Sequence, residues 1–376
     1  MPLHHLEVRE DALCVTWADG PGQTSNPCTY PTIWLRDNCP SAFHPQTHER
    51  VLDLLALDQA PVLTAAESSG EVIVLQYRDG HVSRMPVRLL VAHRPGDAAA
   101  DPAAVPPRTW RADLTAAGIP RYPAGELLAD DAVLHRWMQN TAALGLTLVD
   151  GLETRVDAGI EIARRIGFLR ETNFGVTFEV MSKPDPNNLA YTAVTLPLHT
   201  DLPNQEVPPG FQFLHCIANE AQGGGSCFAD GFALAEDLLA RDAEAFRLLS
   251  EVAIPFRFHD GEADIRTRAP VIGLDPAGRA REIRWNAHIA ATFDMPAALM
   301  PAYYRAYRQF MSMTRDPSYR LGFKLRAGEM IVFDNRRVLH GREAFDPASG
   351  FRHLNGCYVD RGEFDSRLRL LAREKH

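Results

Sequence analysis

Short strand-like runs separated by turn residues fill the second half of the chain, and they constrain its fold more than any other feature. From Tyr191 onward, apolar or alternating stretches recur with Gly, Pro, Asn and Asp between them. The runs are FQFLHCI, GGSCFADGF, VAIPFRF, EIRWNAH, EMIVFDN and LNGCYVD, interrupted by helical segments at 233–252 and 295–313. Strands without regular intervening helices pair antiparallel, so the pattern predicts a double sheet of the jelly-roll type.

The N-terminal part of the chain has strand-like runs of its own, namely ALCVTW, PTIWLRD, RVLDLLAL, EVIVLQY and HVSRMPV. A stretch rich in Ala, Asp and Pro follows them, with the composition of an exposed linker. Beyond it, residues 126–145 and 156–167 have helical periodicity around the strand-like LTLVDGL. We predict a small β-rich domain over 1–95, a linker over 96–120, and a mainly β jelly-roll domain with helices over 121–376.

Composition and charge narrow the class of function. With 376 residues, 45% of them hydrophobic, the chain can bury a substantial core. A net charge of -9 and a pI near 5.9 argue against nucleic acid, and no run of Lys or Arg suggests a membrane patch. No secretory leader or membrane span is recognisable, and six scattered cysteines fit free thiols in a reducing compartment. We expect a cytoplasmic protein that acts on a small molecule.

The segment LPLHTDLP carries the most specific chemical signal. It places His199 and Asp201 two residues apart, so on an extended strand both side chains project from one face. A third ligand, His340, follows a strand-like run and a turn in EMIVFDNRRVLHGR, and a jelly roll folds back far enough to bring it near. Two imidazoles and one carboxylate leave one octahedral face of iron(II) open for dioxygen and a chelating co-substrate. The pattern predicts an oxygenase iron site.

Arg352 and Ser226 are predicted to anchor the co-substrate. Arg352 comes twelve positions after His340, at the start of a strand-like run that can carry its guanidinium into the same sheet interior. A 2-oxo acid that chelates iron needs its distal carboxylate held, and the rigid fork of Arg suits a carboxylate. Ser226, in GGGSCF, can add a hydroxyl donor.

Five segments together resemble the γ-butyrobetaine hydroxylase-like branch of the taurine dioxygenase superfamily: NNLAYT, LPLHTD, GFQFLHC, FDNRRVLHGR and RHLNGCYVD. WLRDNC and HPQTHER resemble the small N-terminal domain of this branch, so the resemblance covers nearly the whole chain. It implies a double-stranded β-helix catalytic domain with Fe(II) held by the two histidines and Asp201. It also implies 2-oxoglutarate held by Arg352 with help from Ser226, in agreement with the spacing argument.

The resemblance further implies the reaction and its participants. Dioxygen converts 2-oxoglutarate to succinate and carbon dioxide while an unactivated C–H bond of the substrate becomes hydroxylated, with ascorbate as reductant. The difficult chemistry belongs to the cofactor. The implied substrate is a small zwitterion that bears a quaternary ammonium, with γ-butyrobetaine giving L-carnitine as the first candidate. The implied assembly is a homodimer.

Family members of known activity hold a trimethylammonium group in an aromatic cage, and the matching positions here are all aromatic: Phe174, Phe178, Tyr191 and Tyr358. A quaternary ammonium cannot donate hydrogen bonds, so ring faces attract it, each contact contributing about 0.5 to 2 kcal/mol. Asn188 and Asn286 match positions that line the pocket where the substrate's anion lies.

The chain departs from the family pattern in two places. Leu202 stands where some carnitine-forming members carry a Tyr that addresses the substrate carboxylate, which keeps a trimethylammonium phosphonate and trimethyllysine open as substrates. In the N-terminal domain only Cys39 remains of a zinc-binding Cys cluster, and Ser41 stands where a thiolate is expected. His81 matches the later ligand and His44 is a further candidate, but half of a four-ligand set is missing, so structural zinc is doubtful.

A different class of protein fits part of the same pattern, namely a non-catalytic protein that uses a metal to bind a ligand. The intact iron ligands and Arg352 argue against it, because such a protein has little need for an open iron face and a carboxylate anchor. A metal-dependent hydrolase would need a general base beside the metal-bound water, and no feature of the sequence requires that class of enzyme. We therefore expect a 2-oxoglutarate-dependent dioxygenase.

Overall fold

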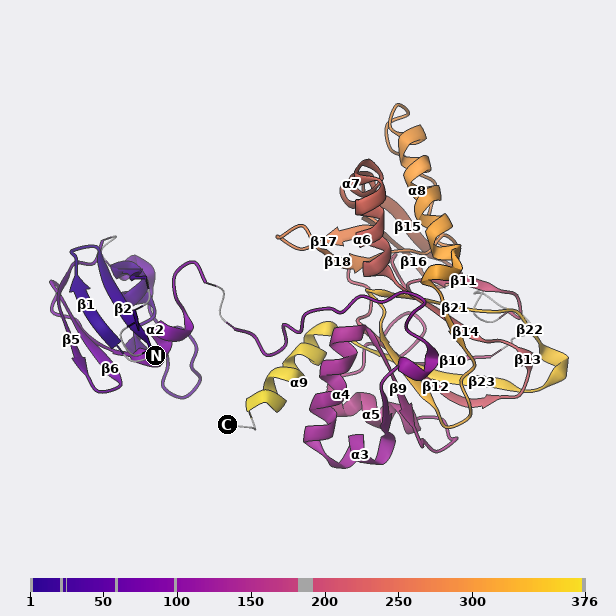
Figure 1. The fold of residues 1–376 in the computed structure, drawn as a ribbon, viewed down its shortest axis with the longest axis horizontal. Helices are drawn as coiled ribbons and strands as arrows, with labels where there is room; N and C mark the ends of the chain where they lie inside the picture. Colours follow the sequence, from indigo (N-terminus) through magenta and orange to yellow (C-terminus); the bar gives the residue numbers. More distant parts are fainter. Residues whose placement is uncertain are drawn as a thin grey trace. The chain divides into compact units, whose positions relative to one another are not determined.

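The computed structural model describes residues 3–20, 23–24, 26–57, 60–97, 100–181 and 192–373 of the chain (Figure 1). It divides into two compact units, Met1–Asp101 and Pro102–His376. Two of the predicted site residues, Asn188 and Tyr191, lie outside the described residues.

The N-terminal unit is built from two small antiparallel sheets. One contains β1 Leu3–Val8, β2 Ala12–Gly20, β3 Gln23–Thr24 and β4 Cys28–Pro31; the other contains β5 Leu63–Ser69, β6 Val72–Tyr77 and β7 Val82–Pro86, and two short helices follow strands, α1 Thr32–Asp37 and α2 Val87–Ala92. Alternate residues of β2, including Leu13, Val15 and Trp17, pack against Ile73 and Leu75 of β6 in one buried cluster. The period-two pattern of these strands thus forms a core within this unit.

Two of the strand predictions in this unit are wrong. Pro31 ends β4, and residues 32–37 form the helix α1, which places Thr32, Leu35 and Arg36 on one buried face, as the spacing i, i+3, i+4 allows. Residues 50–57 belong to none of the described sheets: Arg50 forms an isolated bridge with Phe43, and Asp53 accepts a hydrogen bond from the Leu55 backbone N–H and starts a single 3-10 turn at Leu54–Ala56. The side chain of Leu55 is 94% exposed, so the apolar run there has no sheet face to cover.

Two facing sheets form the centre of the second unit (Figure 1). The six-stranded sheet has the order β10 Thr177–Val180, β23 Arg352–Val359, β12 Phe211–Asn219, β20 Met330–Asp334, β9 Leu146–Asp150 and β8 Arg121–Pro123. The four-stranded sheet has the order β11 Leu196–His199, β21 Val338–Arg342, β14 Ser226–Asp230 and β19 Leu321–Phe323. Within these sheets only β8 and β9 pair parallel, and the predicted jelly-roll class is confirmed.

Three strand pairs extend this framework: β13 Gln222–Gly223 with β22 Phe345–Asp346, β15 Ile254–His259 with β16 Asp264–Ala269, and β17 Ile272–Leu274 with β18 Ala280–Ile283. The helices are α3 Ala124–Ala129, α4 Asp131–Leu144, α5 Ala158–Ile166, α6 Gly231–Arg241, α7 Ala243–Glu251, α8 Met300–Arg315 and α9 Arg361–Arg373. The helical run predicted over 126–145 is divided at Asp130, whose carboxylate caps α4 by accepting from the backbone N–H groups of Ala132 and Val133.

The helices cover the sheets from two sides (Figure 1). Helices α4 and α5 pack on the large sheet, and their apolar residues share a core with Phe213 of β12 and Val332 of β20. Helices α6, α7 and α8 gather near β15 to β18, where Trp285 and Phe310 belong to a second core. A third core, to which Phe228 of β14 and Phe333 of β20 belong, fills part of the space between the two sheets.

The segment predicted as a linker, 96–120, contains buried residues. Trp110 and Ile119 are 4% and 2% exposed and belong to a core cluster of the second unit. The Trp110 indole N–H donates to the carbonyl of Leu144 at 2.8 Å, and its backbone N–H donates to Asp230 at 3.1 Å. The linker boundaries stay a prediction, but this part of the segment packs into the core of the second unit.

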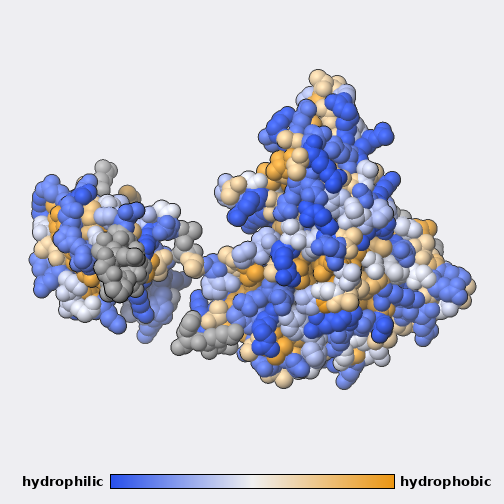
Figure 2. All heavy atoms as spheres, viewed as in Figure 1, coloured by the Kyte–Doolittle hydropathy of each residue, from blue (hydrophilic) through white to orange (hydrophobic). Residues whose placement is uncertain are grey.

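The molecular surface is largely polar on the face drawn in Figure 2, where hydrophilic residues predominate and hydrophobic ones lie scattered among them. Scattered apolar side chains are ordinary on a folded protein. Among the described residues, no helix is both long and apolar enough to cross a membrane.

Candidate metal centre

Strand register brings the two histidines of the predicted iron site together. His199 ends β11 and His340 lies in β21, and the two residues are direct partners in the antiparallel pairing of these strands. Opposed residues in such a pair have Cβ atoms about 5 Å apart, so a separation of 141 positions in the sequence becomes a contact. The imidazole ring centroids lie 4.3 Å apart. Asp201 follows two positions after His199, just beyond the strand end.

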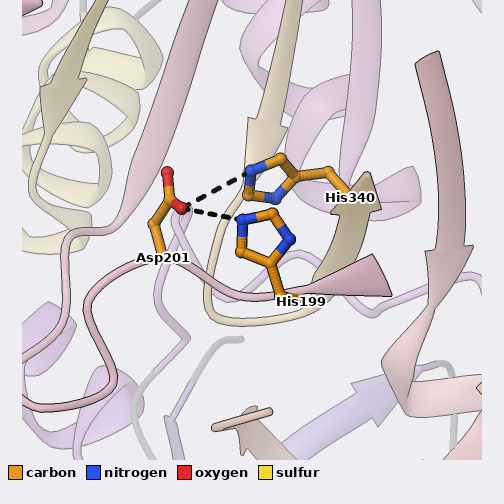
Figure 3. A group of neighbouring side chains, drawn as sticks. All are labelled: His199, Asp201 and His340. Carbon is orange, nitrogen blue, oxygen red and sulfur yellow. Dashed lines mark ion pairs between the residues drawn. The ribbon is translucent and has the colours of Figure 1, made fainter. Parts of the chain in front are cut away.

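The three side chains converge on one point (Figure 3). One ligand atom from each lies within 4.8 Å of the others, and Asp201 Oδ1 lies 3.2 Å from His199 Nε2 and 3.6 Å from His340 Nε2. Burial alone would raise the pKa of Asp201, but the neighbouring imidazoles and a hydrogen bond from Tyr358 hold it well below its ordinary value. Burial, together with His199, lowers the pKa of His340 to about 3. The group therefore offers a carboxylate at Asp201 and a neutral imidazole at His340.

Neighbouring groups orient these ligands. The carbonyl of Pro197 lies 2.9 Å from His199 Nδ1 and can only accept, so Nδ1 carries the proton and Nε2 presents its lone pair. The buried amide of Asn335 accepts from the Asp201 backbone N–H at 2.7 Å and donates to the Asp201 carbonyl at 3.1 Å. The Tyr358 hydroxyl donates to Asp201 Oδ2 at 2.7 Å. Such supporting contacts are typical of residues that hold a metal.

The donor set fits iron(II). Two imidazole nitrogens from adjacent strands and one carboxylate oxygen from just beyond the end of β11 would bind an ion from one side and leave its other coordination positions open. Among the described residues, this is the one group of three or more His, Cys, Asp or Glu side chains with ligand atoms close enough to share an ion. His199, Asp201 and His340, predicted from sequence, are thus brought together.

A cavity of about 390 Å³ opens onto the three ligands. Every predicted site residue that the structure describes lines it: His199, Asp201, His340, Arg352, Ser226, Phe174, Phe178, Asn286 and Tyr358. These residues come from five strands and from loops that are far apart in the sequence. One chamber therefore joins the metal group to the predicted co-substrate and substrate positions.

Arg352 supplies a buried cation to this cavity. It is 6% exposed, and its Nε and Nη1 atoms are buried with no hydrogen-bond partner among the described residues. Burial, together with the nearby Arg342, lowers the pKa of Arg352 to about 10, so its guanidinium stays charged near neutrality. A buried charge is costly unless an anion neutralises it. Arg352 therefore fits the distal carboxylate of 2-oxoglutarate, and Ser226, 9% exposed, lines the same chamber.

The aromatic residues form another wall of the cavity. The rings of Phe178 and Tyr358 lie 5.0 Å apart at 31°, and Phe174 contacts Phe258 edge to face at 5.3 Å. Phe178 lies opposite Gly356 in the β10–β23 register, where a side chain would collide with its ring. The wall can thus offer ring faces to a cation.

Asn286 lines the cavity, and two hydrogen bonds fix the position of its side chain. Its side-chain oxygen accepts from the His288 backbone N–H at 3.1 Å, and its amide donates to the Thr200 carbonyl at 3.4 Å. Leu202 also lines the cavity, 7% exposed and with a φ of 53°, a conformation that side chains other than Gly adopt rarely.

Sequence reasoning missed four cationic or imidazole side chains of the cavity wall: Arg257, His259, His288 and Arg342. Arg342 directly follows the HG dipeptide of the predicted motif and is 5% exposed. It lies two positions after His340 in β21, so the alternation of a strand could have predicted that both side chains face the cavity. His288 lies in the run EIRWNAH, predicted as a strand, but β18 ends at Ile283 and the remainder is a loop beside the cavity.

The N-terminal residues that resemblance links to zinc have a different environment. Cys39 Sγ lies 3.0 Å from the hydroxyls of Ser41 and Ser83 and 3.5 Å from His81 Nε2. His44 instead accepts from backbone N–H groups in its own turn. One thiol, one imidazole and two hydroxyls are a poor set for zinc, which prefers four thiolate, imidazole or carboxylate ligands.

A jelly roll that presents two histidines and a carboxylate in one cavity with a buried arginine defines the class of non-haem iron oxygenases. Residues 111–358 match the family described as taurine catabolism dioxygenase TauD, TfdA family, and residues 4–86 match the γ-butyrobetaine hydroxylase-like N-terminal domain. The chain belongs to the TauD, TfdA family. It is an Fe(II)- and 2-oxoglutarate-dependent dioxygenase, as the sequence predicted.

Curated relatives span almost the whole chain. A γ-butyrobetaine dioxygenase from Pseudomonas sp. (strain AK-1) is 45% identical over 99% of this chain and 97% of its own length. The human γ-butyrobetaine dioxygenase is 29% identical over 91% of each chain. A mitochondrial trimethyllysine dioxygenase from Gallus gallus is 31% identical over 90% of this chain and 82% of its own.

Proposed function

We propose that this enzyme hydroxylates γ-butyrobetaine to L-carnitine. The observation that carries the proposal is the single cavity that joins the metal ligands to a wall of aromatic rings. The rings suit a trimethylammonium group, which has no N–H to donate. Similarity to γ-butyrobetaine dioxygenases over nearly the full chain supports the same substrate.

Separate residues would bind Fe(II) and 2-oxoglutarate. His199, Asp201 and His340 would hold Fe(II), and Arg352 with Ser226 would hold 2-oxoglutarate by its distal carboxylate. When bound, these cofactors supply the oxidising chemistry: dioxygen and 2-oxoglutarate are consumed, succinate and carbon dioxide are released, and one substrate C–H becomes C–OH. The protein contributes the orientation of both molecules in one cavity.

The substrate is held at its two charged ends. Phe174, Phe178 and Tyr358 would receive the ammonium, with Tyr191 and Asn188 as further predicted contacts outside the described residues. Asn286 would donate to the carboxylate, and the imidazole of His288 lies on the same cavity wall. Fixing both ends of a short flexible chain places one of its carbons beside the metal and lowers the entropy that the reaction must lose.

The test is succinate release by anaerobically purified, Fe(II)-loaded enzyme given 2-oxoglutarate, ascorbate and oxygen, with the hydroxylated product measured separately. γ-Butyrobetaine should stimulate succinate formation and yield L-carnitine in near-equal amount. Leu202 motivates two comparison substrates, 2-trimethylaminoethylphosphonate and trimethyllysine. If either one stimulates succinate release more strongly than γ-butyrobetaine, that compound is the substrate instead. Slow succinate release that none of the three compounds stimulates would exclude all three as substrates.

Variants of the metal ligands test the chemical core of the proposal. His199→Ala and Asp201→Ala should abolish both succinate and product while the far-ultraviolet circular dichroism stays unchanged, since each removes one of three ligands. Turnover retained by either variant would mean that the iron is bound elsewhere.

The predicted homodimer and cytoplasmic location stay predictions, supported by the family resemblance and by composition. Light scattering coupled to size-exclusion chromatography would test the first, and fractionation of the native cells would test the second.

A further inference from the structure

The two oxygens of the Asp201 carboxylate have different partners. Oδ1 faces the imidazoles of His199 and His340, whereas Oδ2 accepts the hydroxyl of Tyr358 at 2.7 Å. We propose that Tyr358 is a positioning residue whose hydroxyl fixes the Asp201 carboxylate for the metal, while its ring forms part of the substrate wall. The role of the ring rests on the proposed function; the role of the hydroxyl does not.

The hydroxyl acts on a rotation that is otherwise weakly constrained. The terminal torsion of an aspartate joins sp³ and sp² carbons and has a broad energy profile, so the carboxylate turns easily about it. A hydrogen bond to a charged oxygen is short and strong, and 2.7 Å falls in that class. With Oδ2 held, Oδ1 is the oxygen that remains directed at the two imidazole nitrogens.

The main chain of Asp201 is fixed independently of Tyr358. Asn335, 0% exposed, accepts from the Asp201 N–H and donates to the Asp201 carbonyl, and its amide also donates to the Pro209 carbonyl at 3.2 Å. Loss of the Tyr358 hydroxyl therefore frees the carboxylate without releasing the backbone that carries it. This separation makes the hydroxyl testable on its own.

Tyr358 is itself held rigidly enough to serve as a fixed point. It is 4% exposed, pairs with Gln212 in the β12–β23 register, and its carbonyl accepts from the Arg170 backbone N–H at 2.8 Å. Its ring lies 5.0 Å from that of Phe178. One side chain thus contacts both the metal carboxylate and the aromatic wall, so a ligand on the rings and an ion at the carboxylate share a common support.

The test compares three variants of the full-length protein by their affinity for Fe(II) alone, measured anaerobically without 2-oxoglutarate or substrate. Tyr358→Phe should weaken Fe(II) binding by roughly 10- to 100-fold, the usual effect of removing a group that orients a metal ligand. Phe178→Leu removes the neighbouring ring but leaves the hydroxyl, so it should bind Fe(II) as the wild type does. Tyr303→Phe is the matched control, because the Tyr303 hydroxyl is buried in α8 and has no hydrogen-bond partner in the part of the chain that the structure describes.

A catalytic readout separates positioning from substrate binding. With the substrate identified above, Tyr358→Phe should release more succinate per hydroxylated product, with little change in the substrate KM because the ring remains; Phe178→Leu should chiefly raise KM. Unchanged Fe(II) affinity in Tyr358→Phe would overturn the proposal, as would equal weakening by Phe178→Leu. Because the Fe(II) measurement needs no substrate, its result stands even if no tested compound is hydroxylated.

Discussion

Gly356 is the residue on which the aromatic wall depends most directly. A Cβ placed there would lie 2.6 Å from the Cε2 and Cζ atoms of the Phe178 ring and 3.0 Å from Leu214. Gly356→Ala should therefore displace the ring and raise the KM for the trimethylammonium substrate by about tenfold, equivalent to about 1.4 kcal/mol of lost ring contact. Steady-state kinetics would measure this change at saturating 2-oxoglutarate.

The same substitution at a harmless glycine provides its control. Gly125 lies in α3, and a Cβ there meets nothing within 4 Å. Gly125→Ala should leave KM unchanged and stabilise the helix slightly. An unaltered KM in Gly356→Ala would show that the Phe178 ring does not contribute to substrate binding.

At Arg352 the expected effect falls on the co-substrate. Arg352→Ala removes a buried cation whose Nε and Nη1 have no hydrogen-bond partner among the described residues. The KM for 2-oxoglutarate should therefore rise by at least about tenfold. Arg352→Lys keeps the charge but loses the fork, and its effect should be intermediate. Titration of succinate release with 2-oxoglutarate measures both. Arg266→Ala, which breaks an exposed ion pair, is the control; an unchanged requirement in Arg352→Ala would remove the assigned role.

At the scale of elements, one strand organises much of the site. Alternate residues of β23 share a face, and Arg352, Leu354 and Tyr358 on this face line the cavity, with Gly356 between the last two. At about 3.3 Å per residue the first and last lie roughly 20 Å apart. The strand therefore sets the distance between the co-substrate anchor and the tyrosine that holds the metal carboxylate.

The packing of α5 on β12 predicts a pH dependence of stability. His215, in β12, is 1% exposed, and neither ring nitrogen has a partner among the described residues. Burial, with contributions from Arg155 and His353, lowers its pKa to about 4. The unfolded chain binds a proton near the ordinary pKa of 6.5 while the folded chain does not, so this residue costs stability as the pH falls from 6.5 towards 4.

His215→Leu should remove that cost. The loss attributable to His215 between pH 7 and pH 4 is about 3 kcal/mol, so the variant's free energy of unfolding should fall that much less than the wild type's over the same range. Urea unfolding of metal-free protein at both pH values gives the difference. Parallel curves for the two proteins would mean that His215 is protonated in the folded state.

The iron ligands could be predicted from sequence because each lies in a short recognisable pattern: an HxD pair at a strand end, and 141 positions later a histidine that follows the strand-like run EMIVFDN. The cavity wall around Arg257 and His288 could not be predicted from sequence. A hydrogen bond from the Arg257 backbone N–H to the Ile289 carbonyl brings these two segments together, and no local sequence pattern indicates it. The errors at 31–37 and 50–57 have the same origin. Short apolar runs suit a strand, a helix or an exposed turn, and tertiary packing decides among them.

At the scale of the whole molecule, all three iron ligands belong to the unit Pro102–His376, whereas the unit Met1–Asp101 has its own hydrophobic core. A ligand stabilises only the part whose folded state binds it. Metal binding should therefore act on one unit and leave the other unchanged.

Scanning calorimetry of the full chain under anaerobic conditions tests this expectation. Fe(II) at 100 times its Kd stabilises a single site by about 2.7 kcal/mol, which should raise the transition of the second unit by about 5 °C. The transition of the N-terminal unit should not move, and a chelator should reverse the shift. His199→Ala, which lacks one ligand, should show no shift at the same Fe(II) concentration. If both transitions rise together, the two units unfold as one cooperative body; if the His199→Ala protein also shifts, Fe(II) stabilises the chain at another site.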